Sequence, residues 1–336
     1  MSTKYPGGFI TKSPVAPSQG IAPGIWTLEQ ALQLKKQGVW PPLVPGAPTI
    51  GTATQTGSTT ATVDFTAPAS NGGSVITSYT ATSSPGSVTG TLSQAGSGTI
   101  TVTGLNAGAS YTFTVTATNA IGTSAASAAS NSITTALPAI GAAFGGGFFA
   151  GQIGVSSVAT HNLVVGPLST AQTTSTQWKN ANTATSGADS VIDGPQNTAD
   201  IVADGNSTVY PAAHFCNDLV IGGFSDWYLP AKNELEVCYY NLKPDATSNN
   251  TGGTNGVNPN AVPARASNYT AGTPAETSAA AFKTGGAQAF SGAFFYWSST
   301  ETGATTALRQ YFYTGNQANG TKTSYLNVRA VRRVAV

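Results

Sequence analysis

The stretch Tyr111-Thr112-Phe113-Thr114-Val115-Thr116-Ala117 alternates large or apolar residues with threonine at every second position. A period of two is typical of a β-strand that has one face buried and the other in water. Turn-forming residues such as Asn71-Gly72-Gly73 and Pro85-Gly86 separate further segments of this kind, which span residues 61–65, 76–81 and 99–102. We therefore expect residues 46–136 to fold as an all-β domain.

Residues 46–136 also resemble a fibronectin type III domain over its whole length of about 100 residues. The resemblance rests on three motifs: Pro45-Gly46-Ala47-Pro48, Phe65-Thr66-Ala67-Pro68 and Leu105-Asn106-Ala107-Gly108-Ala109-Ser110-Tyr111. It implies that Leu105 fills the core and that Tyr111 forms a tyrosine corner, while the phenylalanine of the second motif replaces the usual tryptophan. Since the domain has no Arg-Gly-Asp motif, we expect it to act as a spacer.

The remaining residues, 137–336, differ in chemistry and contain recognisable blocks at 144–151, 211–216, 223–236, 296–301 and 328–334. The most specific are Asp226-Trp227-Tyr228-Leu229-Pro230 and Tyr296-Trp297-Ser298-Ser299-Thr300-Glu301. In this order the blocks resemble the C-terminal domain of Legionella collagen-like adhesins, which also occurs in phage fibre proteins. That family is similar to the C-type lectin fold and to the formylglycine-generating-enzyme fold.

Two helices, at 211–219 and 231–240, and short strands at 294–298, 309–313 and 328–334 fit this resemblance. The expected fold class is therefore multidomain. An all-β fibronectin type III sandwich at 46–136 is followed by an α+β C-type lectin-like head domain at 137–336, and a short docking segment at 1–45 precedes both.

The docking segment contains one helix signal, which begins at Thr27 with Gln30 as a capping box and ends at Gly38. Its apolar face is more hydrophobic than so short a segment can bury by itself. We expect it to dock on a larger assembly, a virion, through Trp26, Leu28, Leu32 and Trp40. The alternative is that this face packs on the next domain.

Composition excludes several classes of function. The 14 Lys and Arg residues nearly balance the 13 Asp and Glu residues, and the net charge of +1 gives no general attraction to nucleic acid. No apolar run reaches the about 20 residues that cross a membrane. The first residues lack the apolar stretch of a secretory signal, so we do not expect export by the general secretory route.

Catalysis and metal binding find little support in the sequence. His161 and His214 are far apart and have no zinc-type spacing, so we expect packed or exposed histidines. One stretch that we expect to be a loop contains four carboxylates that could bind calcium: Asp189, Asp193, Asp200 and Asp204. Solvated acids are favoured there, because the calcium-dependent sugar-binding motifs Glu-Pro-Asn and Gln-Pro-Asp are absent. Cys216 and Cys238 do not match a copper-binding pair, and we expect two reduced, packed thiols rather than one bridge. We expect no catalytic residue, no cofactor and no metal.

Charged residues are scarce, and several lie inside the aromatic blocks of the head. Buried charges must be paired, so we expect internal hydrogen-bonded pairs that fix loops to involve Asp226, Glu234, Glu301, Arg329 and Arg332.

Receptor recognition is better supported. The segment 301–320 combines tyrosine, arginine, amide and threonine side chains on a scaffold with glycine turns, a mixture typical of antibody paratopes and sugar sites. In phage proteins with C-type lectin folds, the corresponding region carries receptor binding. The candidate binding residues are Thr302, Thr305, Arg309, Gln310, Tyr311, Tyr313, Asn316, Gln317 and Asn319. The alternative is an ordinary solvated hairpin.

Together these features resemble a bacteriophage virion protein of the tail-fibre or head-fibre kind. The resemblance implies binding to other virion proteins through residues 1–45 and to a host-surface glycan or protein through the head, with no nucleic acid bound and no membrane insertion. Phage fibres are commonly trimeric, so we expect a homotrimer, although no heptad or collagen repeat is present. A purely architectural decoration protein of the capsid or baseplate is the alternative, and a bacterial adhesin is disfavoured because no export signal is evident.

Overall fold

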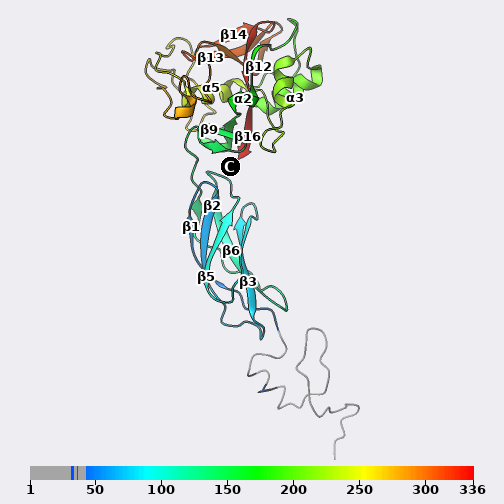
Figure 1. Cartoon of the computed structure of the whole chain (residues 1–336), viewed down its shortest axis with the longest axis vertical. Helices are drawn as coiled ribbons and strands as arrows, with labels where there is room; N and C mark the ends of the chain where they lie inside the picture. The colour runs from blue at the N-terminus through cyan, green and yellow to red at the C-terminus, as the bar shows by residue number, and fades with distance from the viewer. Residues whose placement is uncertain (1–31, 34–35, 37–42) are drawn as a thin grey trace, which may run out of the picture. The chain divides into compact units, whose positions relative to one another are not determined.

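The computed structural model of the chain describes residues 32–33, 36 and 43–336 (Figure 1). The chain divides into two compact units, Met1–Leu137 and Pro138–Val336, which we call the sandwich unit and the head. In the expected docking segment Leu32 is helical and its side chain is 51% exposed. The other three docking residues, Trp26, Leu28 and Trp40, lie outside the described residues. Among the described residues, no helix has the length and apolar character needed to cross a membrane.

The sandwich unit contains two antiparallel sheets. The first, in the order β1-β2-β5, consists of β1 (Thr49–Gln55), β2 (Thr60–Thr66) and β5 (Gly98–Thr103). The second, in the order β4-β3-β6-β7, consists of β4 (Thr89–Leu92), β3 (Ile76–Ser84), β6 (Ser110–Asn119) and β7 (Ile133–Thr134). The four segments predicted from alternation are thus strands, in β2, β3, β5 and β6.

The residues that alternate in the sequence form the core between these sheets. In β6 the residues Tyr111, Phe113 and Val115 are buried, while the threonines between them are only partly buried. The predicted tyrosine corner is confirmed, because the backbone N–H of Asn106 donates to Tyr111 Oη at 2.9 Å. Leu105 is buried as expected, so the sequence motif determines both the core contact and the corner.

A ladder of three serines covers one edge of β6, and it was not predicted from the sequence. Ser124, Ser127 and Ser130 recur every third residue, and the Oγ of each accepts a hydrogen bond of 2.9–3.0 Å from a backbone N–H of β6. Their own N–H groups donate back to β6 carbonyls at 2.8–2.9 Å. The ladder therefore satisfies backbone groups that a regular edge strand would otherwise pair.

The head also contains two sheets. One is antiparallel, in the order β16-β10-β9-β8, and consists of β16 (Val331–Ala335), β10 (Val158–Val165), β9 (Gly147–Val155) and β8 (Ala143–Phe144). The other is mixed, in the order β11-β15-β12-β13-β14, and consists of β11 (Gln172–Gln177), β15 (Tyr325–Arg329), β12 (Phe295–Gly303), β13 (Thr306–Tyr311) and β14 (Gln317–Thr321). The single strand expected at 328–334 is wrong: the chain leaves one sheet at Arg329 and enters the other at Val331.

The helices of the head are short. They are α2 (Leu168–Ala171), α3 (Gly194–Asp204), α4 (Pro211–Asn217) and α5 (Lys232–Leu242), with a 3₁₀ turn η1 (Ala280–Phe282). The two predicted helices correspond to α4 and α5. The expected loop around Asp200 and Asp204 is wrong, because both lie in α3, which Asp193 caps by accepting the N–H of Gln196. The described part of the chain contains no group of three His, Cys, Asp or Glu residues placed to hold a metal ion.

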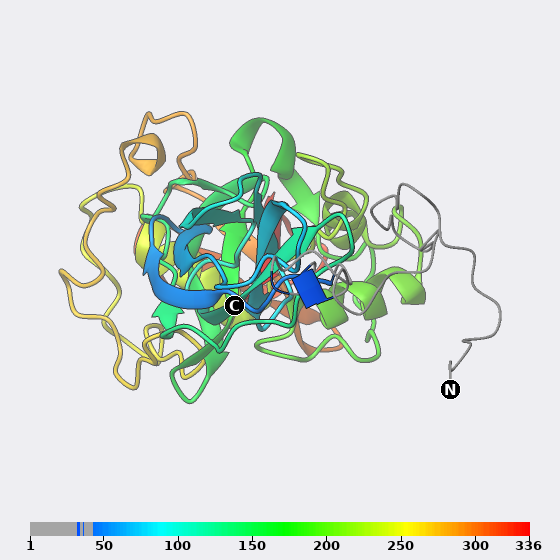
Figure 2. The ribbon, with the colours of Figure 1, turned by 90° about the horizontal axis from the view of Figure 1, so that it is seen from below.

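Two separate hydrophobic clusters fill the head. One includes Tyr239, Phe290, Tyr296 and Phe312, and the other includes Trp178, Trp227 and Trp297. Cys238 belongs to the first cluster and Cys216 to the second, and both thiols are free and buried. In both views of the ribbon, the yellow to orange segment 243–290 lies on the opposite side of the head from α3 (Figures 1 and 2).

Candidate functional site

The turn between β13 and β14, residues 312–316, is the centre of the candidate site. Gly315 has φ +73°, and a Cβ at this position would lie 2.3 Å from Tyr239 Cε1, so only glycine fits. The N–H of Gly315 donates to Tyr311 O at 2.8 Å, and Thr314 O accepts the N–H of Asn250 at 2.8 Å. The turn is thus fixed both internally and to a distant loop.

A polar pocket of about 450 Å³ lies beside this turn, and we call it the amide pocket. Four amide side chains border it, together with one lysine: Asn250, Asn255, Asn316, Gln317 and Lys232. The Asn255 side chain is held in place because its Oδ1 accepts the backbone N–H of Gln317 at 2.9 Å. The pocket therefore combines fixed hydrogen-bonding groups with a single cation.

Two glutamines at this site have side-chain atoms without hydrogen-bond partners. Gln310 and Gln317 are directly opposite each other on β13 and β14, so their side chains share one face of the sheet. Gln310 Oε1 and Gln317 Nε2 are both buried and make no hydrogen bond among the described residues. Lys232 and Gln317 border both the amide pocket and a narrower gap that reaches Gln310. Leaving such a buried group unsatisfied costs about 1–3 kcal/mol.

Lys232 is the first residue of α5, and its backbone N–H donates to Thr300 Oγ1 at 3.0 Å. Its ammonium group makes no hydrogen bond or ion pair with the described residues. Partial burial lowers the pKa of Lys232, and the Glu236 carboxylate opposes this effect. The lysine can therefore offer its donors to a molecule that enters the amide pocket.

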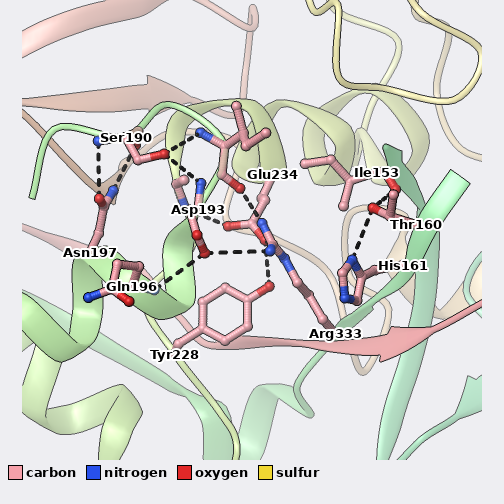
Figure 3. Close-up of polar contacts among 12 residues, drawn as sticks. Ile153, Thr160, His161, Ser190, Asp193, Gln196, Asn197, Tyr228, Glu234 and Arg333 are labelled. Carbon is pink, nitrogen blue, oxygen red and sulfur yellow. Dashed lines mark hydrogen bonds and ion pairs between the residues drawn. The ribbon is translucent and has the colours of Figure 1, made fainter. Parts of the chain in front are cut away.

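The N-terminus of α5 is anchored by the first of two buried glutamates. Glu234 accepts hydrogen bonds from Tyr228 Oη at 2.5 Å, from the Ala231 N–H at 2.8 Å and from Arg333 Nε at 2.7 Å (Figure 3). Asp193 adds a second carboxylate, 3.5 Å from Arg333 Nη1. Burial raises the pKa of Glu234, whereas its hydrogen bonds and Arg333 lower it. The network fixes the start of α5 and with it the position of Lys232.

Glu236, two residues further along α5, anchors the loop that contains Asn258, Arg265 and Tyr269. Its carboxylate accepts hydrogen bonds from Asn258 Nδ2 at 2.6 Å and from Tyr269 Oη at 2.7 Å, and it is ion-paired with Arg265. Burial raises the pKa of Glu236, and Arg265 and the hydrogen bonds oppose this. Since Gln310 Nε2 donates to Tyr269 Oη at 3.4 Å, the second network extends to the floor of the candidate site.

His161 lies next to the first network and is not part of a catalytic arrangement in the described residues (Figure 3). Its Nδ1 lies 3.0 Å from Thr160 Oγ1. Burial lowers the pKa of His161, and the positive charge of Arg333 lowers it further. His214 Nε2 contacts Gly205 O at 2.7 Å, so each histidine has a local partner.

The structure separates the predicted recognition residues into three groups. Asn316 and Gln317 border the amide pocket, and Gln310, at 1% exposure, is buried beneath them rather than on the surface. Thr302, Thr305 and Asn319 are exposed at the other end of the hairpin, where Thr302 Oγ1 donates to Asn319 Oδ1 at 3.0 Å.

The third group lies on the opposite face of β13. The guanidinium of Arg309 lies 4.1 Å from the ring centre of Phe295, and the Tyr311 ring stacks on Phe295 at 4.7 Å. The face of Tyr311 that meets Phe295 is thus closed to a ligand. Tyr313, 41% exposed, borders a second pocket that none of the other predicted recognition residues lines.

The predicted internal charge pairs are largely confirmed. Arg332 holds Asp226 through two hydrogen bonds of 2.7 and 2.9 Å, and Lys322 Nζ lies 2.9 Å from Glu301 Oε1. Glu234 pairs with Arg333, as described above. Arg329 is the exception, because none of its described partners is a carboxylate.

Arg329 is almost fully buried and hydrogen-bonds only to neutral groups. Its Nε donates to Gly166 O at 2.8 Å, its Nη1 to Gln172 Oε1 at 3.2 Å and its Nη2 to Gln288 Oε1 at 3.4 Å. Burial lowers the pKa of Arg329 to about 10. The expectation of a carboxylate partner is therefore wrong for this residue.

Three residues of the amide pocket were not predicted as ligand-binding residues. Lys232 lies in a recognised sequence block, but nothing in that block distinguishes a pocket lysine from a surface one. Asn250 and Asn255 come from the segment 249–256, which is rich in Asn, Gly and Thr and carries no periodic signal. Only the tertiary fold brings them next to β14.

Two protein-family models match parts of the chain, one in each unit. A fibronectin type III model matches residues 46–133, and the Lcl C-terminal domain model matches residues 169–332. No curated protein matches the chain.

Among solved structures, domains A168–A170 of titin are 30% identical, with a TM-score of 0.25, and the match covers 28% of this chain and 33% of that one. The twitchin kinase region of C. elegans is 23% identical, with a TM-score of 0.24 and coverage of 28% and 17%, respectively. Chicken CNTN1 FN1–FN3 domains are 15% identical, with a TM-score of 0.24 and coverage of 28% and 33%. This chain thus spans a third or less of each of these structures. By its family matches, the chain carries a fibronectin type III domain followed by an Lcl C-terminal domain.

Proposed function

We propose that this chain is a bacteriophage virion protein, a tail or head fibre, whose head binds a glycan or protein on the host surface. Binding rather than catalysis is the proposed activity. The domain order supports this, since a spacer followed by a terminal Lcl-type domain suits display of a binding head. We further propose that the head is C-type lectin-like. Its short helices, two small sheets and long loops support that proposal, and superposition of an experimental structure on lectin domains tests it.

The observation that carries the proposal is the amide pocket, where Gln317 has an unpartnered amide nitrogen and Gln310, buried beneath the pocket, has an unpartnered amide oxygen. Gln310 Oε1 needs a donor and Gln317 Nε2 needs an acceptor. Native proteins satisfy nearly all of their buried polar groups, so a ligand in the amide pocket that accepts a hydrogen bond from Gln317 is favoured. A sugar hydroxyl both donates and accepts, and Lys232 can add further donors.

Adsorption to cells tests this proposal. Fluorescently labelled full-length protein is mixed with cells of the bacterium on which the phage is grown, and the bound fraction is measured by flow cytometry. We expect saturable binding that Gln317→Ala and Lys232→Ala each reduce at least 10-fold. Gln196→Ala is the matched control, because it removes an exposed amide on α3. An absence of saturable binding by the wild-type protein would favour the decoration protein instead.

Attachment to the virion is a separate part of the proposal. The apolar residues of segment 1–45 support docking on other virion proteins, and the usual symmetry of fibres supports a homotrimer. Deleting residues 1–45 should give particles that lack the protein, and particles that retain it would contradict the docking role. Sedimentation of the purified full chain should give three times the 33.8 kDa mass of one chain, and a monomer would contradict the trimer.

A further inference from the structure

A second pocket, of about 580 Å³, lies on the head where Tyr313 follows β13, and we call it the Tyr313 pocket. It is bordered by Gln172, Asp245 and Phe290 in addition to Tyr313. It shares none of its lining residues with the amide pocket. Among the described residues that border it, Asp245 alone is charged, whereas the amide pocket has a lysine.

Gly292 borders this pocket, in close contact with both Tyr313 and Asp245. A Cβ at Gly292 would lie 2.9 Å from Tyr313 Cδ2 and 3.0 Å from Asp245 Oδ2. The edge of the aromatic ring and the carboxylate oxygen therefore lie within about 6 Å of each other, and both lie close to Gly292. Since the φ of Gly292 is not in the left-handed region, a side chain there would disturb the packing of Tyr313 and Asp245 and would not strain the backbone.

The Asp245 carboxylate has a free acceptor. Its Oδ1 accepts the N–H of Thr247 at 2.9 Å, which fixes the orientation of the group. Its Oδ2, which lies close to Gly292, makes no hydrogen bond among the described residues. Lys243, two residues earlier, is buried and directs its ammonium to the carbonyls of Thr247 and Pro274 instead. A carboxylate oxygen held in this way can accept hydrogen bonds from ligand hydroxyls.

Gln172 provides a donor of fixed orientation. Its Oε1 lies 3.2 Å from both Arg329 Nη1 and Tyr296 Oη. Arginine can only donate, so the amide oxygen must be the atom that faces it. The Tyr296 hydroxyl already accepts the N–H of Ser291 at 2.9 Å, which leaves its proton for Gln172. The Gln172 Nε2 group must therefore point away from these partners, and the residue borders the pocket.

This arrangement also explains why Arg329 is buried without a carboxylate. The guanidinium bonds to both Gln172 and Gln288, and Gln288 Oε1 in turn accepts the N–H of Leu168, which borders the pocket, at 2.8 Å. Its positive charge thus fixes two neutral amides behind the pocket wall. A carboxylate partner would neutralise it and would compete for the same donors.

We propose that the Tyr313 pocket binds one neutral pyranose ring, the terminal or an internal unit of a surface polysaccharide. The apolar face of the sugar packs on the Tyr313 ring, one or two adjacent hydroxyls donate to Asp245 Oδ2, and another hydroxyl accepts from Gln172 Nε2. An acidic sugar is disfavoured because its charge would face Asp245. This inference rests on the proposed function in that it takes the receptor to be a glycan, and it names the class of sugar.

Direct binding of soluble sugars to the full-length protein tests the inference without host cells. The probes are the methyl glycosides of glucose, galactose, mannose, rhamnose and N-acetylglucosamine, with glucuronic acid and N-acetylneuraminic acid as acidic comparators. Saturation-transfer NMR gives the binding curves. We expect at least one neutral sugar to bind at millimolar concentration and neither acidic sugar to bind more tightly.

Three variants locate the binding. Asp245→Asn, Tyr313→Ala and Gly292→Ala should each weaken binding at least 10-fold, whereas Tyr313→Phe should retain most of it. Tyr325→Ala is the matched control, because it removes a tyrosine that is 65% exposed on β15. Tryptophan fluorescence confirms that each variant is folded. The inference is overturned if no neutral sugar binds, if acidic sugars bind more tightly, or if the three variants bind like the wild type. Sugar binding without cell adsorption would leave it standing and overturn the proposed function alone.

Discussion

Replacing Glu236 by alanine should destabilise the head strongly, because this carboxylate anchors three groups at once. Its side chain is fully buried and is bonded to Arg265, Asn258 and Tyr269. Alanine would remove the negative charge and leave the Arg265 guanidinium, only 16% exposed, without its partner. The loop that carries Asn258, Arg265 and Tyr269 would therefore lose its attachment to α5.

The expected cost follows from the burial of this pair. Breaking a buried ion pair by removing one partner costs about 3–5 kcal/mol. A domain of this kind has a total free energy of unfolding of about 5–15 kcal/mol. At a urea dependence of about 2 kcal/mol per molar, the unfolding midpoint should fall by about 1.5–2.5 M.

Urea denaturation of the full-length protein, followed by tryptophan fluorescence, measures this loss. Residues 46–136 contain no tryptophan, whereas Trp178, Trp227 and Trp297 are all buried in the head. The fibronectin type III domain therefore contributes no tryptophan to the signal, and the two tryptophans outside the head, Trp26 and Trp40, precede that domain.

Glu276→Ala is the matched control. Its carboxylate lies 2.7 Å from Lys283 Nζ, but the two side chains are 33% and 43% exposed. Such a surface pair contributes about 0.2–1 kcal/mol. If Glu236→Ala cost no more than this control, the reasoning that the network anchors the loop would be refuted. A double-mutant cycle with Arg265→Met should then also show no coupling.

Three further predictions concern stability. Ser127→Ala should lower the free energy of unfolding of the sandwich unit by about 1–3 kcal/mol, because the buried N–H of Val115 loses its acceptor. Calorimetry of the full chain measures this loss. The control Ser132→Ala should cost little, and equal effects of the two substitutions would contradict the role of the ladder. Burial raises the pKa of Glu236 above 4.5, so its contribution to the free energy of unfolding falls as pH rises from 4.5 through the folded-state pKa. Glu236→Gln removes this titration, so its free energy of unfolding should rise relative to that of the wild type as pH increases over this range. Urea titrations at several pH values measure the difference, and a difference that does not change with pH would contradict the prediction. Gly315→Ala should cost more than about 1 kcal/mol in the same assay, since alanine at φ +73° would also clash with Tyr239, and an unchanged midpoint would show that the turn can yield.

The sequence predicts the sandwich unit well because its signal is local. Alternation places Tyr111, Phe113 and Val115 on one face, and turn residues separate the strands. The serine ladder at 124–130 has a visible period of three, but that period gains meaning only beside β6. The expected strand at 328–334 fails for a related reason: nothing in Val328-Arg329-Ala330-Val331 marks the residue at which the chain changes sheets.

The candidate sites were less predictable than the fold. The segment 301–320 was identified from its mixture of side chains, and Asn316, Gln317 and Tyr313 do border pockets. Residue type alone, however, cannot tell that alternate positions of β13 face opposite sides, which buries Gln310 and stacks Tyr311 on Phe295. The partners that complete each pocket, such as Lys232 and Asp245, come from distant segments and depend on tertiary packing.

The central claim is that the head binds a host-surface glycan through the amide pocket. The affinity of the full-length protein for polysaccharide purified from the host envelope, measured by biolayer interferometry, tests it most directly. We predict saturable binding that weakens at least 10-fold in the Lys232→Ala and Gln317→Ala variants and is unchanged in Gln196→Ala. Binding that is absent, or equal in all four proteins, would contradict the claim.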